Sequence, residues 1–327
     1  MQHKTLGRTG LQVSIVGLGA AFIGIPHPNQ AAREYPESDQ QSPTSHMEDD
    51  LGIQCVHTAI EAGCTLIDTA PLYGGTRSET IIGKALKARP DLAEKVTVTT
   101  KCGRWREGYD YTADSIRRQI DASLERLGLD RFRVAYIHDP MGQPMEQVMA
   151  ADGALGALRK LQGEGIVDHI GIAANDPPTN APYIETGEFD AAVVPEAWSL
   201  LNQVAAERIL SAAEKHNVGL VIATPVERGL LATGPVEDID YLARDFSQDC
   251  LNHVSKIQTL CNDHNIPMVA AALQWCTRHP QVSATIPGAR TPDEAVQNAN
   301  AGSAEIPETF WSDLEPLIQH WEQGVHR

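Results

Sequence analysis

The chain has 327 residues, of which 42% are hydrophobic and 21% charged, so it is long enough to bury a large core. The formal net charge is −17, and no run of Lys and Arg could neutralise a row of phosphates, so nucleic acids and anionic membranes are not expected partners. No apolar stretch reaches the roughly 20 residues of a membrane helix, and "MQHKTLGRTG" lacks the apolar segment of a signal peptide. The six cysteines form no CxxC pattern, which predicts reduced thiols in a cytoplasmic protein.

Strand-like runs and helical patterns alternate along the chain. A first helix passes through Ile53, Val56 and Ile60 and ends at Gly63, and a later helix lies between Thr112 and Gly128. The other predicted helices cover residues 78–86, 144–163, 178–186, 202–216 and 250–264. The predicted strands cover residues 13–20, 65–70, 95–101, 132–139, 168–174, 189–194, 218–224 and 282–288.

This alternation predicts a parallel sheet covered by helices. About eight strand-helix pairs, spaced roughly 30 to 40 residues apart, favour a closed (β/α)8 TIM barrel over an open doubly wound sheet. No composition break or linker divides the chain, so residues 1–327 are expected to form a single domain. Two polar segments, 27–46 and 228–247, follow strands and are predicted to be rim loop insertions.

Ionisable residues end three successive predicted strands: Asp68 after "TLI", Lys101 after "VTVTT" and His138 after "VAYI". The carboxyl ends of barrel strands surround one mouth, so these three side chains are expected to meet there. Tyr73 lies on the loop that leaves the Asp68 strand. A neighbouring lysine cation stabilises phenolate and lowers a tyrosine pKa below its usual value of about 10. A buried lysine in turn needs a counter-ion, which predicts a role for Asp68.

At these residues the chain resembles the aldo-keto reductase superfamily. The resemblance rests on "LIDTAPLYGG…SETIIGKAL", "TTKCGR" and "YIHD", which match the Asp, Tyr, Lys, His tetrad of that family. Within the family, "YGGTRSE", "TKCGRWREGYDY" and "IDASLERLGLD" look most like the aldose 1-dehydrogenases, which act on L-galactose, L-fucose and other D-threo-type sugars. The resemblance implies a (β/α)8 barrel that binds a nicotinamide cofactor without a Rossmann fold.

The resemblance also implies a mechanism. Tyr73 would act as general acid/base on the anomeric oxygen, Lys101 would lower the pKa of Tyr73, Asp68 would hold the lysine, and His138 would orient the substrate oxygen. An aldose would be oxidised to its lactone by hydride transfer to nicotinamide. Two alternatives stay open at this stage. One is an NADPH-dependent aldehyde or ketone reductase, and the other is a non-catalytic regulatory subunit of the same fold.

Cofactor residues are implied by the same resemblance and come from four segments. Ala174 and Ala223 stand where many family members have a serine and a stacking tyrosine. The implied cofactor-binding residues are Gly19, Ala20, Asn175, Thr224, Pro225, Gly229, Leu231, Gly288, Ala289, Arg290, Glu294, Gln297 and Asn298.

The choice of cofactor depends on the segment after the last strand. Family members that favour NADP often carry a lysine and an arginine at the positions of Gly288 and Glu294. A glutamate can accept hydrogen bonds from ribose hydroxyls but repels a 2′-phosphate, so NAD is the expected cofactor. Arg290 lies on the same loop and could pair with that phosphate, so NADP stays possible.

Three weaker signals have ordinary structural explanations. "GLGAAF" resembles the start of a dinucleotide fingerprint but lacks its third glycine, and His253, Cys261 and His264 are not spaced as zinc ligands, so no metal is expected. Trp105 and Tyr109 could either wall a sugar pocket or pack within their loop.

Overall fold

The computed structural model describes residues 1–25, 45–105, 108–237, 239, 241–242 and 244–322. Eight parallel strands form one sheet in the order β3-β4-β5-β8-β9-β10-β11-β12. Their bounds are β3 Leu18–Gly19, β4 Leu66–Asp68, β5 Thr97–Cys102, β8 Phe132–His138, β9 Val167–Ala173, β10 Ala191–Pro195, β11 Gly219–Ala223 and β12 Val282–Thr285.

The first and last strands of this sheet meet, which closes the barrel. The Gly17 amide donates to the Thr285 carbonyl at 2.8 Å, and the Gly19 amide donates to the Pro287 carbonyl at 3.0 Å. A parallel bridge also joins Gly19 to Gly288. Since every strand then has two neighbours, the (β/α)8 barrel predicted from the alternation is confirmed.

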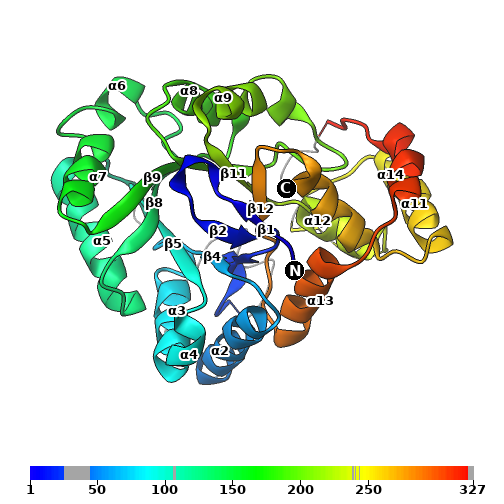
Figure 1. Ribbon diagram of the computed structural model, residues 1–327, viewed down its shortest axis with the longest axis horizontal. Helices are drawn as coiled ribbons and strands as arrows, with labels where there is room; N and C mark the ends of the chain where they lie inside the picture. Colours follow the sequence, from blue (N-terminus) through cyan, green and yellow to red (C-terminus); the bar gives the residue numbers. More distant parts are fainter. Residues whose placement is uncertain (26–44, 106–107, 238, 240, 243, 323–327) are drawn as a thin grey trace.

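Helices form a ring around the strands (Figure 1). Their bounds are α2 Ser45–Glu61, α3 Arg77–Ala88, α4 Pro90–Ala93, α5 Ala113–Leu127, α6 Met145–Val148, α7 Ala154–Gly163, α8 Pro177–Glu185, α9 Ile209–His216, α10 Leu230–Thr233, α11 Gln248–Asp263, α12 Met268–Arg278, α13 Pro292–Ser303 and α14 Glu308–Leu314. Short 3-10 helices are η1 Gly7–Thr9, η2 Ala20–Phe22, η4 Val204–Ala206, η5 Glu227–Gly229 and η6 Glu315–Leu317.

An antiparallel hairpin of β1 (His3–Thr5) and β2 (Gln12–Ser14) closes the amino end of the barrel. The Ser283 hydroxyl donates to the Thr5 carbonyl at 3.0 Å, and Leu6 and Val13 insert into the barrel core. The single strand predicted over residues 13–20 is therefore wrong, because its first part pairs with the hairpin and its last part with the barrel.

Two of the helix predictions also need correction. The predicted helix 144–163 is two helices, α6 and α7, because Gly153 turns the chain back so closely that a Cβ there would lie 2.0 Å from the Gln147 carbonyl. The sequence pattern predicted α11 but missed α12, whose residues Ala270 to Leu273 are fully buried. Helix α12 packs beside β12, whereas α11 packs in an outer cluster with Phe310 and Leu314 of α14.

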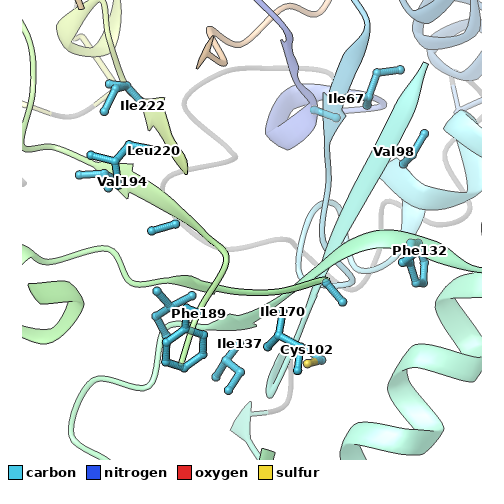
Figure 2. Close-up of a cluster of buried hydrophobic side chains, with 14 of the residues drawn as sticks. Ile67, Val98, Cys102, Phe132, Ile137, Ile170, Phe189, Val194, Leu220 and Ile222 are labelled. Atoms are coloured by element: carbon cyan, nitrogen blue, oxygen red, sulfur yellow. The ribbon is translucent and has the colours of Figure 1, made fainter. Parts of the chain in front are cut away.

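Side chains of each strand alternate between two cores. Outward-facing residues, including Ile67, Val98, Ile137, Ile170 and Ile222, pack beneath the helices (Figure 2). Inward-facing residues fill the barrel, and these are Leu66, Val134, Tyr136, Ala173, Ala191, Val193, Val221 and Ala284. Gly171 makes room for the Tyr136 ring, since a Cβ there would lie 2.2 Å from that ring. All six cysteines are buried and unpaired.

The two predicted rim loops have different outcomes. Segment 27–46 lies outside the described residues except for 45 and 46, which begin α2. Segment 228–247 follows β11 as predicted, but it begins with a short helical stretch, η5 and then α10, before the chain reaches α11. Among the described residues, no helix is long and apolar enough to cross a membrane.

Candidate active site

Strand alternation places three ionisable residues at the carboxyl mouth of the barrel. Asp68 is two residues beyond the inward-facing Leu66, and His138 is two residues beyond the inward-facing Tyr136. Lys101 lies on the strand between them, two residues after Thr99. Because residues i and i+2 of a strand share a face, all three side chains point into the barrel, and all three are buried.

Lys101 lies at the centre of this group. Its ammonium donates to Asp68 Oδ2 at 2.5 Å and to the Thr69 carbonyl at 2.9 Å, and the Thr99 hydroxyl donates to Asp68 Oδ1 at 3.1 Å. Burial alone would lower the pKa of Lys101, but Asp68 and Tyr73 outweigh it and the pKa is raised. The lysine is therefore a buried cation at neutral pH.

Tyr73 lies on the turn after β4 and returns over the mouth. The Lys101 ammonium donates to Tyr73 Oη at 3.2 Å and lies 4.7 Å from the centre of the ring. The Tyr73 and His138 rings meet edge to face, with centroids 6.1 Å apart. The four residues expected from the sequence are thus in one cluster.

The pKa of Tyr73 differs from the sequence-based expectation. Burial raises the pKa of Tyr73 to about 12, even though the Lys101 charge lowers it and Asp68 raises it further. The expectation of a net decrease was wrong, because removing the phenolate from water raises its free energy by more than one neighbouring ammonium lowers it. The Lys101 contribution has the expected sign.

His138 is held as a neutral imidazole. Burial lowers the pKa of His138 well below its usual value of 6.5, and the charges of Lys101 and Arg104 lower it further. Within the described part of the chain, the buried Nδ1 has no hydrogen-bond partner. A neutral imidazole can donate one hydrogen bond to a substrate oxygen without adding a charge to the site.

Asp139 and Arg104 join this cluster and were not predicted. Arg104 begins the short hairpin of β6 (Arg104–Trp105) and β7 (Gly108–Tyr109), and its guanidinium pairs with Asp139 Oδ2. Burial raises the pKa of Asp139, opposed by Arg104 and by the amide of Asn175. The only sequence signal was a second acid directly after His138, and local pattern could not identify its partner 35 residues away.

The residues expected to bind cofactor lie at the end of strand β3 or after strands β3, β9, β11 and β12, so they share the carboxyl end of the barrel with the cluster. Gly229 has a φ of 104° and open space where a Cβ would lie, which leaves its backbone accessible to a phosphate. Leu231 and Ala289 are fully buried, so their side chains belong to the core. The exposed Asn175 side chain and this open backbone fit a dinucleotide at the mouth.

Residues after β12 are linked to one another. Glu294 accepts from the Arg290 backbone amide at 2.8 Å and from the Arg290 guanidinium at 2.7 Å. Asn298 donates to the Gly288 carbonyl at 3.1 Å. The arginine that could have bound a 2′-phosphate is therefore already paired with a carboxylate.

The remaining sequence signals occupy other places. Tyr109 is 47% exposed and stacks on Tyr111, so the β6–β7 hairpin presents an aromatic face at the rim. His253 Nε2 lies 2.7 Å from the Leu317 carbonyl, so this ring nitrogen already has a backbone partner. Within the described ranges, no group of three His, Cys, Asp or Glu side chains could hold a metal ion.

Comparison with known proteins shows the family to which the chain is similar. The sequence profile described as "Aldo/keto reductase family" matches residues 38–319. D-threo-aldose 1-dehydrogenase from Pseudomonas sp is 30% identical over 330 residues, covering 93% of this chain and 94% of the relative. Pyridoxal 4-dehydrogenase from Microbacterium luteolum is 27% identical over 352 residues, covering 96% of each. A solved holo aldo-keto reductase from Bacillus halodurans superposes with a TM-score of 0.75 at 22% identity, covering 98% of both chains.

The profile match spans most of the barrel, and its members are NAD(P)-dependent oxidoreductases acting on small carbonyl or sugar substrates. This chain therefore belongs to the Aldo/keto reductase family and is an oxidoreductase that uses a nicotinamide cofactor.

Proposed function

We propose that this protein oxidises the anomeric carbon of an aldose, of L-galactose, L-fucose or D-threo type, to the lactone, with NAD as the cofactor. The observation that carries the proposal is the chain of contacts from Asp68 through Lys101 to Tyr73 beside a neutral His138. The similarity to a D-threo-aldose 1-dehydrogenase supports the sugar as substrate.

In this mechanism Tyr73 removes the proton of the anomeric hydroxyl as general base. Lys101 stabilises the phenolate that does so, and Asp68 keeps the ammonium in place. His138 donates a hydrogen bond to the substrate oxygen through Nε2, because its Nδ1 is buried. A nicotinamide bound at the mouth would accept the hydride. In the opposite direction Tyr73 acts as general acid toward a carbonyl, which is the reductase alternative.

The exposed face of the β6–β7 hairpin supports a polyhydroxylated substrate. Tyr109 offers an aromatic surface to the apolar face of a sugar ring, and the Arg104 guanidinium, 5.5 Å from the centre of the Tyr109 ring, places hydrogen-bond donors beside it. A hydroxyl-free aldehyde would use neither group. This argument favours an aldose over a simple aldehyde.

The test is a panel of aldoses, pyridoxal and hydroxyl-free aldehydes, run with NAD, NADP and their reduced forms on the wild type and Tyr73→Phe. We expect fastest turnover with an aldose and NAD. Tyr73→Phe should lose about 100-fold or more in kcat while cofactor affinity changes little. Oxidation of pyridoxal alone, or reduction of aldehydes alone, would replace the aldose proposal. Retained turnover in Tyr73→Phe would reject the role of the tyrosine.

The preference for NAD rests on the Arg290–Glu294 pair. Glu294 would accept from ribose hydroxyls and also holds Arg290 away from a phosphate. We expect Glu294→Arg to shift the ratio of kcat/KM toward NADP by at least about tenfold, which is some 1.4 kcal/mol. Asp293→Asn, one position earlier on α13, is the matched control and should leave the ratio unchanged. A wild-type preference for NADP above about tenfold would contradict this assignment.

A further inference from the structure

Asp139 is held in place by contacts from other segments of the chain. Its backbone has a φ of 47°, a region that non-glycine residues seldom adopt. Its amide donates to the Ala173 carbonyl at 2.7 Å, and Tyr111 Oη donates to its carbonyl at 2.8 Å. So many contacts around one strained residue indicate that the position of its carboxylate matters.

That carboxylate lies between two residues of the site. Asp139 Oδ1 accepts from the backbone amide of Asn175 at 2.8 Å, and Oδ2 lies 3.7 Å from His138 Nε2. The Arg104 guanidinium pairs with Oδ2 and offsets the charge, which makes a buried carboxylate tolerable there. The side chain is 7% exposed, so solvent does little to screen it.

The contact with His138 bears on which ring nitrogen carries the proton. A neutral imidazole carries one N–H. The hydrogen bond made by one ring nitrogen usually decides which of the two nitrogens holds the proton. In His138 the buried Nδ1 has no such partner within the described part of the chain. The Asp139 carboxylate lies on the Nε2 side, with Oδ2 3.7 Å from Nε2, and its negative charge favours an N–H dipole there.

We propose that Asp139 is a positioning residue that keeps neutral His138 in the Nε2–H tautomer, the form that can donate to a substrate oxygen. Arg104 is the counter-ion that lets the carboxylate stay charged at this depth. The inference deepens the proposed function, since it explains how His138 would be ready to donate before substrate arrives.

The test compares a variant that keeps the charge at position 139 with one that removes it. Arg104→Lys keeps the carboxylate together with a cation beside it. Arg104→Met/Asp139→Asn keeps an oxygen for the Asn175 amide but turns an NH₂ group toward Nε2, which favours an unprotonated Nε2. Ring nitrogens are read by ¹H–¹⁵N spectra of histidine-labelled protein at about pH 8, where the imidazole is neutral. His138→Asn identifies the His138 signals.

We expect His138 to be Nε2–H in the wild type and in Arg104→Lys, and to lose that tautomer in the double variant. The matched control is Asp168→Asn, which removes a carboxylate paired with Arg133 at the other end of β9. This variant should keep the Nε2–H tautomer of His138. Persistence of Nε2–H in the double variant would overturn the inference. So would a wild type that is Nδ1–H.

Kinetics supply the second measurement. With any substrate that the wild type turns over, kcat of the double variant should fall on the order of 10- to 100-fold below that of Arg104→Lys, with NAD affinity retained. Equal kcat in the two variants would overturn the positioning role. Absence of aldose turnover in every variant, with the tautomer shift still present, would reject the proposed substrate and leave the role of Asp139 standing. Melting temperatures confirm that both variants are folded.

Discussion

Lys101 and Asp68 form a buried ion pair, with side chains 2% and 4% exposed. Removing one partner of such a pair leaves an uncompensated charge, which typically costs about 3–5 kcal/mol. We therefore expect Lys101→Met to lower both the free energy of unfolding and kcat. Lys101→Met/Asp68→Asn has no stranded charge, so it should recover stability without recovering activity. The measurements are denaturant unfolding and kcat per folded enzyme.

A structural role alone would give a different pattern. If Lys101 only neutralised Asp68, the folded fraction of Lys101→Met would turn over as fast as the wild type. The double variant would then be both stable and active. Recovery of activity in the double variant would exclude Lys101 from the proton relay.

Tyr73 sets the expected pH dependence. Its pKa is raised to about 12, so the neutral phenol predominates throughout the range from about pH 7 to pH 10. Oxidation needs phenolate and should accelerate as pH rises, whereas reduction needs the phenol and should not. Ultraviolet difference spectra of wild type against Tyr73→Phe should show no extra phenolate below about pH 10. Ionisation of Tyr73 below about pH 8 in the free enzyme would contradict this.

At the scale of elements, the segment after β11 is anchored by buried charges. Arg244 pairs with Glu196 and with Glu227, and Arg228 pairs with Glu196 at 2.9 Å. The Ser199 hydroxyl donates to Glu227 at 2.5 Å. These contacts connect η5 and the loop before α11 to the loop after β10, so they hold the backbone that the cofactor is expected to contact.

Glu227 makes this anchor sensitive to pH. Burial raises the pKa of Glu227 from 4.5 to about 7, and Glu196 adds to the rise while Ser199, Arg244 and Arg228 oppose it. A raised pKa in the folded state means that its stabilising contribution is complete below about pH 4.5 and is lost as pH rises through about 7. Glu227→Gln does not titrate, so wild-type stability relative to this variant should fall with rising pH, by up to about 3 kcal/mol.

Thermal unfolding of the two proteins between about pH 5 and pH 8 measures this difference. The exposed Glu207, changed to Gln, is the matched control and should show no such trend. A constant difference between wild type and Glu227→Gln over this range would show that the Arg244 and Arg228 charges already keep Glu227 ionised.

At the scale of the whole molecule, the two ends of the barrel have separate tasks. The carboxyl end carries the candidate site, and the amino end is closed by the β1–β2 hairpin. Lys4 fastens that hairpin by donating to the carbonyls of Thr277, His279 and Val282 at 2.7, 3.0 and 2.8 Å. Burial lowers the pKa of Lys4, yet the three acceptors satisfy its ammonium.

Lys4→Met should therefore destabilise the protein without altering its chemistry. Losing hydrogen bonds from a charged donor costs about 1.5–3 kcal/mol, and the free energy of unfolding should fall by that order. The value of kcat/KM should stay unchanged, because the opposite end of the barrel holds the reacting groups. The exposed Lys256 on α11, changed to Met, is the control for loss of one surface lysine. A large fall in kcat/KM with stability intact would contradict the separation of the two ends.

Much of the fold and the central site could be predicted because the signals are local. Alternation of strands and helices predicted eight parallel strands. Because the carboxyl ends of barrel strands surround one mouth, Asp68, Lys101 and His138 were predicted to meet there, and every second side chain of a strand faces the barrel interior. The glycine that ends α5, Gly128, adopts the left-handed conformation expected of it, with a φ of 66°. Each of these inferences needs only a few neighbouring residues.

Only the tertiary structure decided the features that depend on distant segments. The partner of Asp139 is Arg104, 35 residues away, and no local pattern links them. The net pKa of Tyr73 depends on how completely the mouth excludes water. Burial and charge pairing are properties of the space between segments, so the sequence by itself determined which groups reach the site, and folding decided their charge and their partners.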